Sequence, residues 1–269
     1  MNPYNFKPHV DVICDFEPSD DLSQHENEKL SKLCVAIINV KRSTKRREKM
    51  VEKISKLKMN TFFFNAYDGA ELIIHKTHDP FLHIIEHKKN YFLLDYTRHF
   101  DHSMRGNLSV GMVGASLSHI MLYNSLQSFN CDGLLILEDD ATLSQEPSVI
   151  RKYLANLPEG FDMAFLNSES KWWPIERVGK VNDFYSNIKR KHFNASVSYA
   201  ISVRGAGKLL AYIRNDVTRP PDDLCSNAYF INVYTVIASN EFLFGCDYSF
   251  ESDTARFSIK TDTPDSTTV

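Results

Sequence analysis

The sequence predicts an α/β fold with a mostly parallel central sheet flanked by helices. Three observations predict it: unbroken apolar runs suited to strands buried on both faces, amphipathic stretches at helical spacing, and the alternation of the two along the chain. No internal repeat and no linker divides the chain. We therefore expect one domain over residues 32–269, preceded by an extension over residues 1–31 whose acidic, proline-containing composition favours flexibility.

The first elements form a strand–helix–strand unit. Residues 33–38 are an unbroken apolar run, and residues 43–57 place their apolar side chains on one helical stripe. Residues 61–64 predict a second strand, which the turn Tyr67-Asp68-Gly69 ends. Two strands joined by one helix over so short a stretch predict parallel pairing with a right-handed crossover.

The later elements follow the same alternation, apart from one ambiguous stretch. Residues 70–110 mix histidines and aromatic residues without clean periodicity, which favours surface helices and long loops. Further on, the sequence predicts strands at 133–137, 162–166 and 196–203 and helices at 113–129, 149–157 and 206–213. The strand at 133–137 runs directly into the acidic residues Glu138-Asp139-Asp140.

Composition and charge narrow the function classes. The net charge of -3 provides no overall positive field, so we expect no nucleic-acid partner. No apolar run approaches the roughly 20 residues of a membrane-spanning helix, and the N-terminus lacks a signal-peptide pattern. These observations favour a cytoplasmic location (a bacterial cytosol, or a host cytosol for a viral protein) with at most peripheral membrane association. The five scattered cysteines predict reduced thiols rather than a disulfide framework.

The acidic run at the end of the strand at 133–137 is the strongest candidate for a site. Adjacent carboxylates raise one another's pKa, and a divalent cation such as Mg²⁺, Ca²⁺ or Mn²⁺ relieves their repulsion. Ligands of open α/β sheets bind beyond the carboxyl ends of the strands, where this run lies. A solvated turn is one alternative. A phosphoryl-transfer pocket is another, but it expects acidic residues after the first strand, where this chain has Asn39-Val40-Lys41-Arg42.

Four segments in order make the chain resemble glycosyltransferase family 25, which includes lipooligosaccharide and procollagen galactosyltransferases. The segments are Ile38-Asn39-Val40-Lys41-Arg42 with Arg46 and Met50, Ala66-Tyr67-Asp68-Gly69, Gly111-Met112-Val113-Gly114-Ala115-Ser116-Leu117-Ser118-His119, and Leu137-Glu138-Asp139-Asp140. A weaker match follows at Ser198-Tyr199-Ala200-Ile201-Ser202 with Gly205-Ala206, and at Pro220-Pro221-Asp222. The match covers about residues 33 to 225.

The resemblance implies a GT-A type nucleotide-diphospho-sugar transferase fold and an inverting transfer. The donor would be a UDP-sugar, most often of galactose, with Mn²⁺ or Mg²⁺ as cofactor. The acceptor would be a hydroxyl of a saccharide or of hydroxylysine in a collagen-like chain. Lys41, Met112 and Ala115 depart from the family's usual residues, and they motivate an alternative: a sugar-nucleotide-binding or scaffold protein without turnover. The sequence predicts no oligomeric state.

The resemblance also implies roles for individual residues. Glu138 and Asp140 are the expected metal ligands. The expected catalytic residues are Asp222, as the base with Asp223 as its rival, and His119, for which a core position is the alternative. Trp172-Trp173 could stack on an acceptor sugar or lie buried under a loop. Donor binding is expected from Asn39, Arg42, Arg46, Asp68, Gly69, Ser118 and Asp139, although Arg46 could equally be a solvated charge of its basic run.

Overall fold

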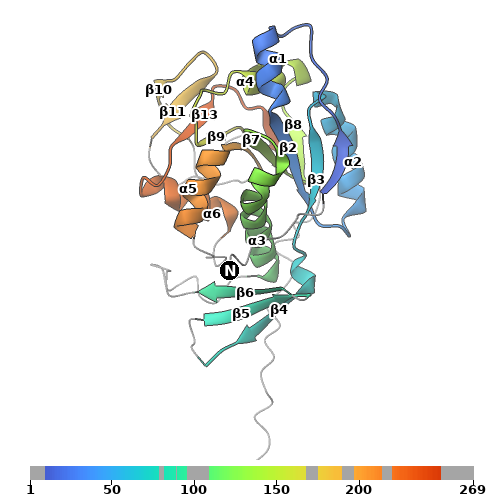
Figure 1. The fold of residues 1–269 in the computed structure, drawn as a ribbon, viewed down its shortest axis with the longest axis vertical. Coiled ribbons are helices and arrows are strands. Elements are labelled where there is room, and N and C mark those ends of the chain that lie inside the picture. Colours follow the sequence, from blue (N-terminus) through green and yellow to red (C-terminus); the bar gives the residue numbers. More distant parts are fainter. Residues whose placement is uncertain are drawn as a thin grey trace, which may run out of the picture.

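The computed structural model describes residues 10–78, 82–88, 90–95, 109–167, 175–189, 197–213 and 220–249. Its largest feature is a nine-stranded sheet (Figure 1). From edge to edge its strands are β1 (Val10–Cys14), β3 (Thr61–Asn65), β2 (Leu33–Asn39), β7 (Gly133–Glu138), β12 (Ser198–Ser202), β9 (Met163–Phe165), β13 (Val236–Ser239), β11 (Tyr185–Ile188) and β10 (Arg177–Lys180).

Three adjacent strands of this sheet, β3, β2 and β7, are parallel. Strand β2 pairs in parallel with β3 and β7, and helix α2 (Thr44–Ile54) connects β2 to β3 as the sequence predicts. A second parallel pair joins β9 to β13, whereas β12 runs antiparallel between β7 and β9. Every residue of β2 is buried, because helices cover both faces of the sheet at this point. The α/β class is confirmed.

Helices form a layer on each face of the sheet. Alternate residues of β2 separate the two cores: Val35 and Ile37 join one cluster, and Ala36 and Ile38 join the other. The first face is covered by α1 (Gln24–Ser31), α2 and α4 (Pro147–Ala155), and the second by α3 (Val110–Ser125), α5 (Val203–Ile213) and α6 (Pro221–Phe230). Within the described segments, no helix combines the length and the apolar character that crossing a bilayer requires.

Two smaller sheets complete the described chain. Strands β8 (Ala141–Leu143) and β14 (Phe244–Cys246) pair just beyond the acidic run. Strands β4 (Leu72–Lys76), β5 (Leu82–His87) and β6 (Asn90–Asp95) form an antiparallel sheet beyond the N-terminal end of α3 (Figure 1).

The three-stranded sheet corrects the prediction of helices and loops between residues 70 and 110. Ile74 and Ile85 are buried, whereas Ile73 and Ile84 are exposed, so the strands have one face on the core and one in solvent. In the sequence the isoleucines stand in adjacent pairs, Ile73-Ile74 and Ile84-Ile85, flanked by histidines and a glutamate, and this arrangement obscures the two-residue period. Residues 96–108 lie outside the described residues.

Residues 10–31 are part of the folded domain, although their composition favoured a flexible extension. Strand β1 adds antiparallel to the free edge of β3, and Arg47 of α2 forms an ion pair with Asp11. Arg151 of α4 donates hydrogen bonds to the backbone oxygens of Glu17 and Leu57, at 2.7 and 3.1 Å. These anchors come from distant parts of the sequence, so composition alone could not reveal them.

A disulfide joins Cys34 to Cys131, with 6.0 Å between their Cα atoms, and it corrects the expectation of reduced thiols for these two of the five cysteines. The two cysteines are 97 residues apart in sequence, so their spacing gives no signal. They meet because β2 and β7 are neighbouring parallel strands, and each cysteine lies near the start of one of them.

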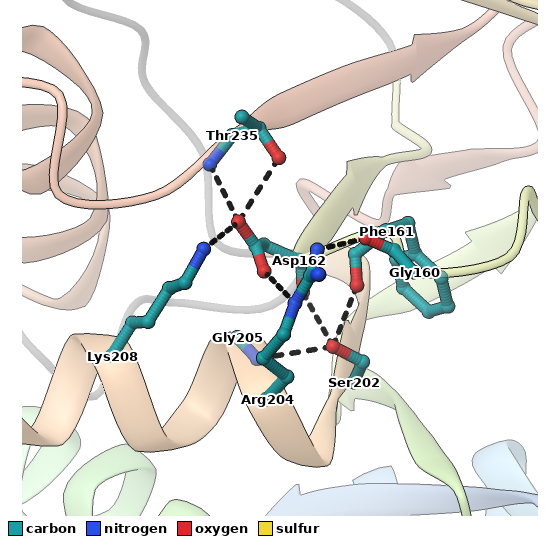
Figure 2. Close-up of polar contacts among 8 residues, drawn as sticks. All are labelled: Gly160, Phe161, Asp162, Ser202, Arg204, Gly205, Lys208 and Thr235. Atoms are coloured by element: carbon teal, nitrogen blue, oxygen red, sulfur yellow. Dashed lines mark hydrogen bonds and ion pairs between the residues drawn. The ribbon is translucent and has the colours of Figure 1, made fainter.

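A buried carboxylate fastens α5 to the sheet (Figure 2). Asp162 precedes β9 and accepts hydrogen bonds from Arg204 Nε and Lys208 Nζ of α5, each at 2.8 Å. It also accepts one from the backbone nitrogen of Thr235, just before β13, at 2.9 Å. Its own backbone oxygen accepts from the backbone nitrogen of Ser202 at 3.1 Å. Elements α5, β12 and β13 therefore converge on one residue at the end of the sheet opposite the acidic run.

Candidate functional site

A pocket lies beyond the carboxyl-terminal ends of β2 and β7 in the large sheet. Parallel strands present their carboxyl ends at one edge, which is the usual ligand crevice of an open α/β sheet. The lining residues come from the ends of β2 and β7, the start of α2, the turn after β3, and α3. They are Ile38, Val40, Arg42, Arg46, Ala66, Tyr67, Asp68, Gly69, Gly111, Ala115, Ser118, His119, Glu138, Asp139 and Asp140.

Asp139 is held inside the protein by two partners. Its carboxylate accepts hydrogen bonds from Arg46 Nη1 at 2.6 Å and from Asn39 Nδ2 at 2.7 Å. Burial raises the pKa of Asp139, and the guanidinium of Arg46 and the amide of Asn39 oppose this rise. The side chain of Arg46 is only 11% exposed, so it is not one of the solvated charges of its basic run. Asn39 lies behind the pocket wall rather than on it.

Arg42 and Asp68 form a second ion pair on the wall of the pocket. Arg42 Nε lies 2.5 Å from Asp68 Oδ2, and Arg42 Nη2 lies 3.3 Å from Oδ1. Asp68 also accepts a hydrogen bond from the backbone nitrogen of Ala70, so it caps the short turn that follows. The side chain of Arg42 is 39% exposed, whereas that of Asp68 is 11% exposed. The guanidinium is therefore the member of the pair that an incoming ligand can reach.

The turn after β3 is seated directly on α3. The backbone nitrogen of Tyr67 donates to Ser118 Oγ at 2.8 Å, and Ser118 Oγ donates to the oxygen of Gly114 at 2.7 Å. A Cβ at Gly114 would lie 2.5 Å from the Tyr67 oxygen, and one at Gly69 would lie 2.7 Å from the Gly111 nitrogen. Only glycine allows so close an approach. Two sequence motifs that are far apart in the chain thus form one contact.

His119 joins the acidic run to the buried core. It is 2% exposed, and its Nδ1 lies 2.7 Å from the hydroxyl of Tyr199 on β12. Its Nε2 lies 3.7 Å from Glu138 Oε1, which is within ion-pair range but longer than a hydrogen bond. Tyr199 lies in the weaker motif at residues 198–202, and the sequence predicts no role for it.

Glu138 and Asp140 have the chemistry of metal ligands. Burial raises the pKa of Asp140 to about 6, and Glu138 and Asp139 add to the rise. Asp140 Oδ1 is buried and accepts no hydrogen bond from the described residues, so it is an oxygen that a cation could satisfy. In the part of the chain that the structure describes, no three His, Cys, Asp or Glu side chains converge on one point. The bound metal and the role of Glu138 and Asp140 as its ligands stay predictions, and the chemistry of these two carboxylates is compatible with that role.

Two of the predicted features lie away from the pocket or outside the described chain. Asp222 and Asp223 are in the first turn of α6 and do not line the pocket, and Asp222 Oδ1 accepts from the backbone nitrogen of Asp223. The role of Asp222 as base stays a prediction. Trp172-Trp173 lie outside the described residues.

Comparison with known proteins identifies a family. Residues 33–225 match the family model described as "Glycosyltransferase family 25 (LPS biosynthesis protein)". A glycosyltransferase 25 family member of Anopheles gambiae is 26% identical over 188 residues, which cover 68% of this chain and 29% of that protein. One of Aedes aegypti is 27% identical over 186 residues, covering 65% of this chain and 27% of that protein. The chain thus spans less than a third of the length of these relatives. Because the family model matches residues 33–225, more than half of the chain, the chain belongs to glycosyltransferase family 25.

Proposed function

We propose that this chain transfers a hexose, most readily galactose, from a UDP-sugar to a hydroxyl group of a saccharide or of a collagen-like chain. One observation carries the proposal: the acidic run, the Arg42–Asp68 pair and the Ser118-His119 segment of α3 line one pocket at the carboxyl edge of the sheet. Membership of the family supports glycosyl transfer, and the family's description as an LPS biosynthesis protein supports a saccharide acceptor.

The described side chains suit a nucleotide diphosphate. Arg42 lies on the pocket wall and is partly exposed, and a guanidinium has the geometry to bind phosphate oxygens. Arg46 and Asn39 fix Asp139, and this fixes the backbone between Glu138 and Asp140. Glu138 and Asp140 would hold Mn²⁺ or Mg²⁺, and the bound metal would neutralise the diphosphate leaving group.

An inverting transfer also needs a base for the acceptor hydroxyl. Asp222 is the proposed base, because the resemblance assigns a carboxylate to its position. It lies in the first turn of α6, a helix that contacts α3, which carries His119. Its neighbour Asp223 is the alternative.

The test compares UDP release from UDP-galactose in the presence of Mn²⁺ for the wild type and two variants. Asp140→Ala should lower turnover roughly a thousandfold, because a lost metal removes several kcal/mol of transition-state stabilisation. Asp183→Ala removes an exposed carboxylate that pairs with Lys180 on the β10–β11 turn, and should leave turnover unchanged. Near-wild-type turnover of Asp140→Ala would refute the assignment. Calorimetry that detects UDP and Mn²⁺ binding without any wild-type turnover would favour a sugar-nucleotide-binding protein.

A further inference from the structure

A series of buried polar side chains leads from the pocket wall into the core. His119 on α3 contacts Tyr199 on β12, and the hydroxyl of Tyr199 is hydrogen-bonded to that of Tyr123, one turn after His119 on α3. The hydroxyl of Tyr123 lies 3.7 Å from the sulfur of Cys225 on α6. All four side chains are at most 3% exposed. The series begins at the pocket wall with Glu138, whose Oε1 lies 3.7 Å from His119 Nε2.

Packing alone does not account for the hydroxyl of Tyr199. Its strand partners are Ile136 on β7 and Phe165 on β9, both apolar. A phenylalanine would fill the same space and would avoid the desolvation of a hydroxyl group. The ring of Tyr199 is also stacked on that of His119, with centroids 5.9 Å apart and 16° between the planes. Tyr199 thus contacts His119 through both its ring and its oxygen.

The chemistry of the series fixes the direction of its hydrogen bonds. Burial raises the pKa of both tyrosines well above the usual value and that of the Cys225 thiol to about 12, so all three keep their protons. If His119 Nδ1 donated to Tyr199, the series would end on sulfur, a weak acceptor, and a bare Nε2 would face the Glu138 carboxylate. The opposite direction runs from the Cys225 thiol through Tyr123 and Tyr199 to Nδ1. It places the proton of His119 on Nε2, where it faces Glu138.

We propose that Tyr199 is a positioning residue of the acidic site, whose hydroxyl fixes the Nε2–H tautomer of His119 and so directs an N–H group at Glu138. At 3.7 Å this N–H attracts the carboxylate without forming a hydrogen bond. Each of two neighbouring carboxylates then faces a dedicated donor: Glu138 faces His119, and Asp139 is bound by Arg46. The inference rests on the proposed function, because the orientation of Glu138 matters for donor binding.

The experiment compares Tyr199→Phe with Tyr185→Phe in the full chain. Tyr185 is also fully buried and donates to the backbone oxygen of Tyr153 at 2.9 Å, but it does not line the pocket. Both variants lose one buried hydroxyl, so both should lower the melting temperature by a similar amount. A loss of stability alone therefore does not support the proposal.

Imidazole ¹⁵N NMR gives the readout that does not depend on activity. We expect the His119 ring, assigned with His119→Gln, to be the Nε2–H tautomer in the wild type and in Tyr185→Phe, and a tautomer mixture in Tyr199→Phe. Tyr123→Phe should shift the ring less, because Tyr199 keeps its own proton to donate. An unchanged tautomer in Tyr199→Phe, or an Nδ1–H tautomer in the wild type, would overturn the proposal.

The second readout is the affinity for UDP with Mn²⁺ and the KM for UDP-galactose. Tyr199→Phe should lower the affinity for UDP and raise the KM for UDP-galactose, each about tenfold, with a smaller change in kcat. A tenfold change is at the low end of what is lost when a residue that orients a metal ligand is replaced. Tyr185→Phe should leave both unchanged. A tautomer change without any change in affinity would show that Tyr199 does not act on the site. A wild type that neither binds UDP nor releases it would instead refute the proposed function, whatever the tautomer.

Discussion

Two glycines on α5, two residues apart, offer a matched test of how this helix is fixed to the sheet. A Cβ added at Gly205 would lie 2.1 Å from the backbone oxygen of Asp162, whereas one added at Gly207 would meet nothing within 4 Å. Both substitutions to alanine favour the helical backbone by about 1 kcal/mol. The contact with Asp162 is therefore the main difference between the two variants.

The size of the effect follows from what Asp162 holds. An ordinary contact begins at 3.4 Å, so α5 or Asp162 must move by about 1.3 Å. Asp162 cannot shift freely, because Arg204, Lys208 and Thr235 all bond to its buried carboxylate (Figure 2). Overpacking costs about 1 to 3 kcal/mol, and weakened bonds to a buried carboxylate add to this. We expect Gly205→Ala to lower the free energy of unfolding by about 3 kcal/mol and Gly207→Ala to raise it by about 1 kcal/mol.

The assay is urea unfolding followed by circular dichroism, with thermal melts as a second measure. The melting temperature should fall by about 6 to 12 °C for Gly205→Ala and rise by about 2 to 4 °C for Gly207→Ala. Equal shifts in the two variants would refute the reasoning. So would a Gly205→Ala protein that is as stable as the wild type.

Two further predictions concern ion pairs. Arg46→Met should lower the free energy of unfolding by about 3 to 5 kcal/mol, because it leaves the buried carboxylate of Asp139 without its cation. In a double-mutant cycle measured by urea unfolding, adding Asp139→Asn should restore much of this loss. The contacts of Glu26 with Lys152, and with Ser23 at the start of α1, lower its pKa to about 2, so its contribution to stability is complete above its usual pKa and is lost as pH falls towards 2. Glu26→Gln should thus be less stable than the wild type at pH 7 and equally stable near pH 2; an equal difference at both would contradict this.

The sequence predicts the middle of the fold well because its strands are buried on both faces. The apolar runs that begin at Leu33 and Leu134 need no knowledge of their partners, and the helix between β2 and β3 follows from its apolar stripe. Strands β4 to β6 were wrongly predicted as helices and loops. Their exposed face mixes isoleucines with charged residues, so neither the two-residue period of a strand nor the 3.6-residue period of a helix dominates the sequence.

The site was predicted in its components but not in its internal bonding. The pocket brings together most of the predicted donor residues with Glu138 and Asp140. That Arg46 is bound to Asp139 could not be read from the sequence, because the partners are 93 residues apart and Arg46 lies in a run of basic residues. Tyr199 was missed for a similar reason: a tyrosine in an apolar strand gives no sign that its hydroxyl meets a histidine 80 residues earlier.

The pairing of β2 with β7 has a consequence for how the chain folds. The two strands are about 100 residues apart, as Asn39 and Asp139 are, whereas the hairpins β4–β5–β6 and β10–β11 close over short distances. Long loops close slowly, since their entropy is lost before any contact compensates it. The hairpins can form early, but the walls of the pocket come from both sides of the long loop. Because both walls of the pocket depend on the β2–β7 pair, we expect the site to form only after these two strands have paired.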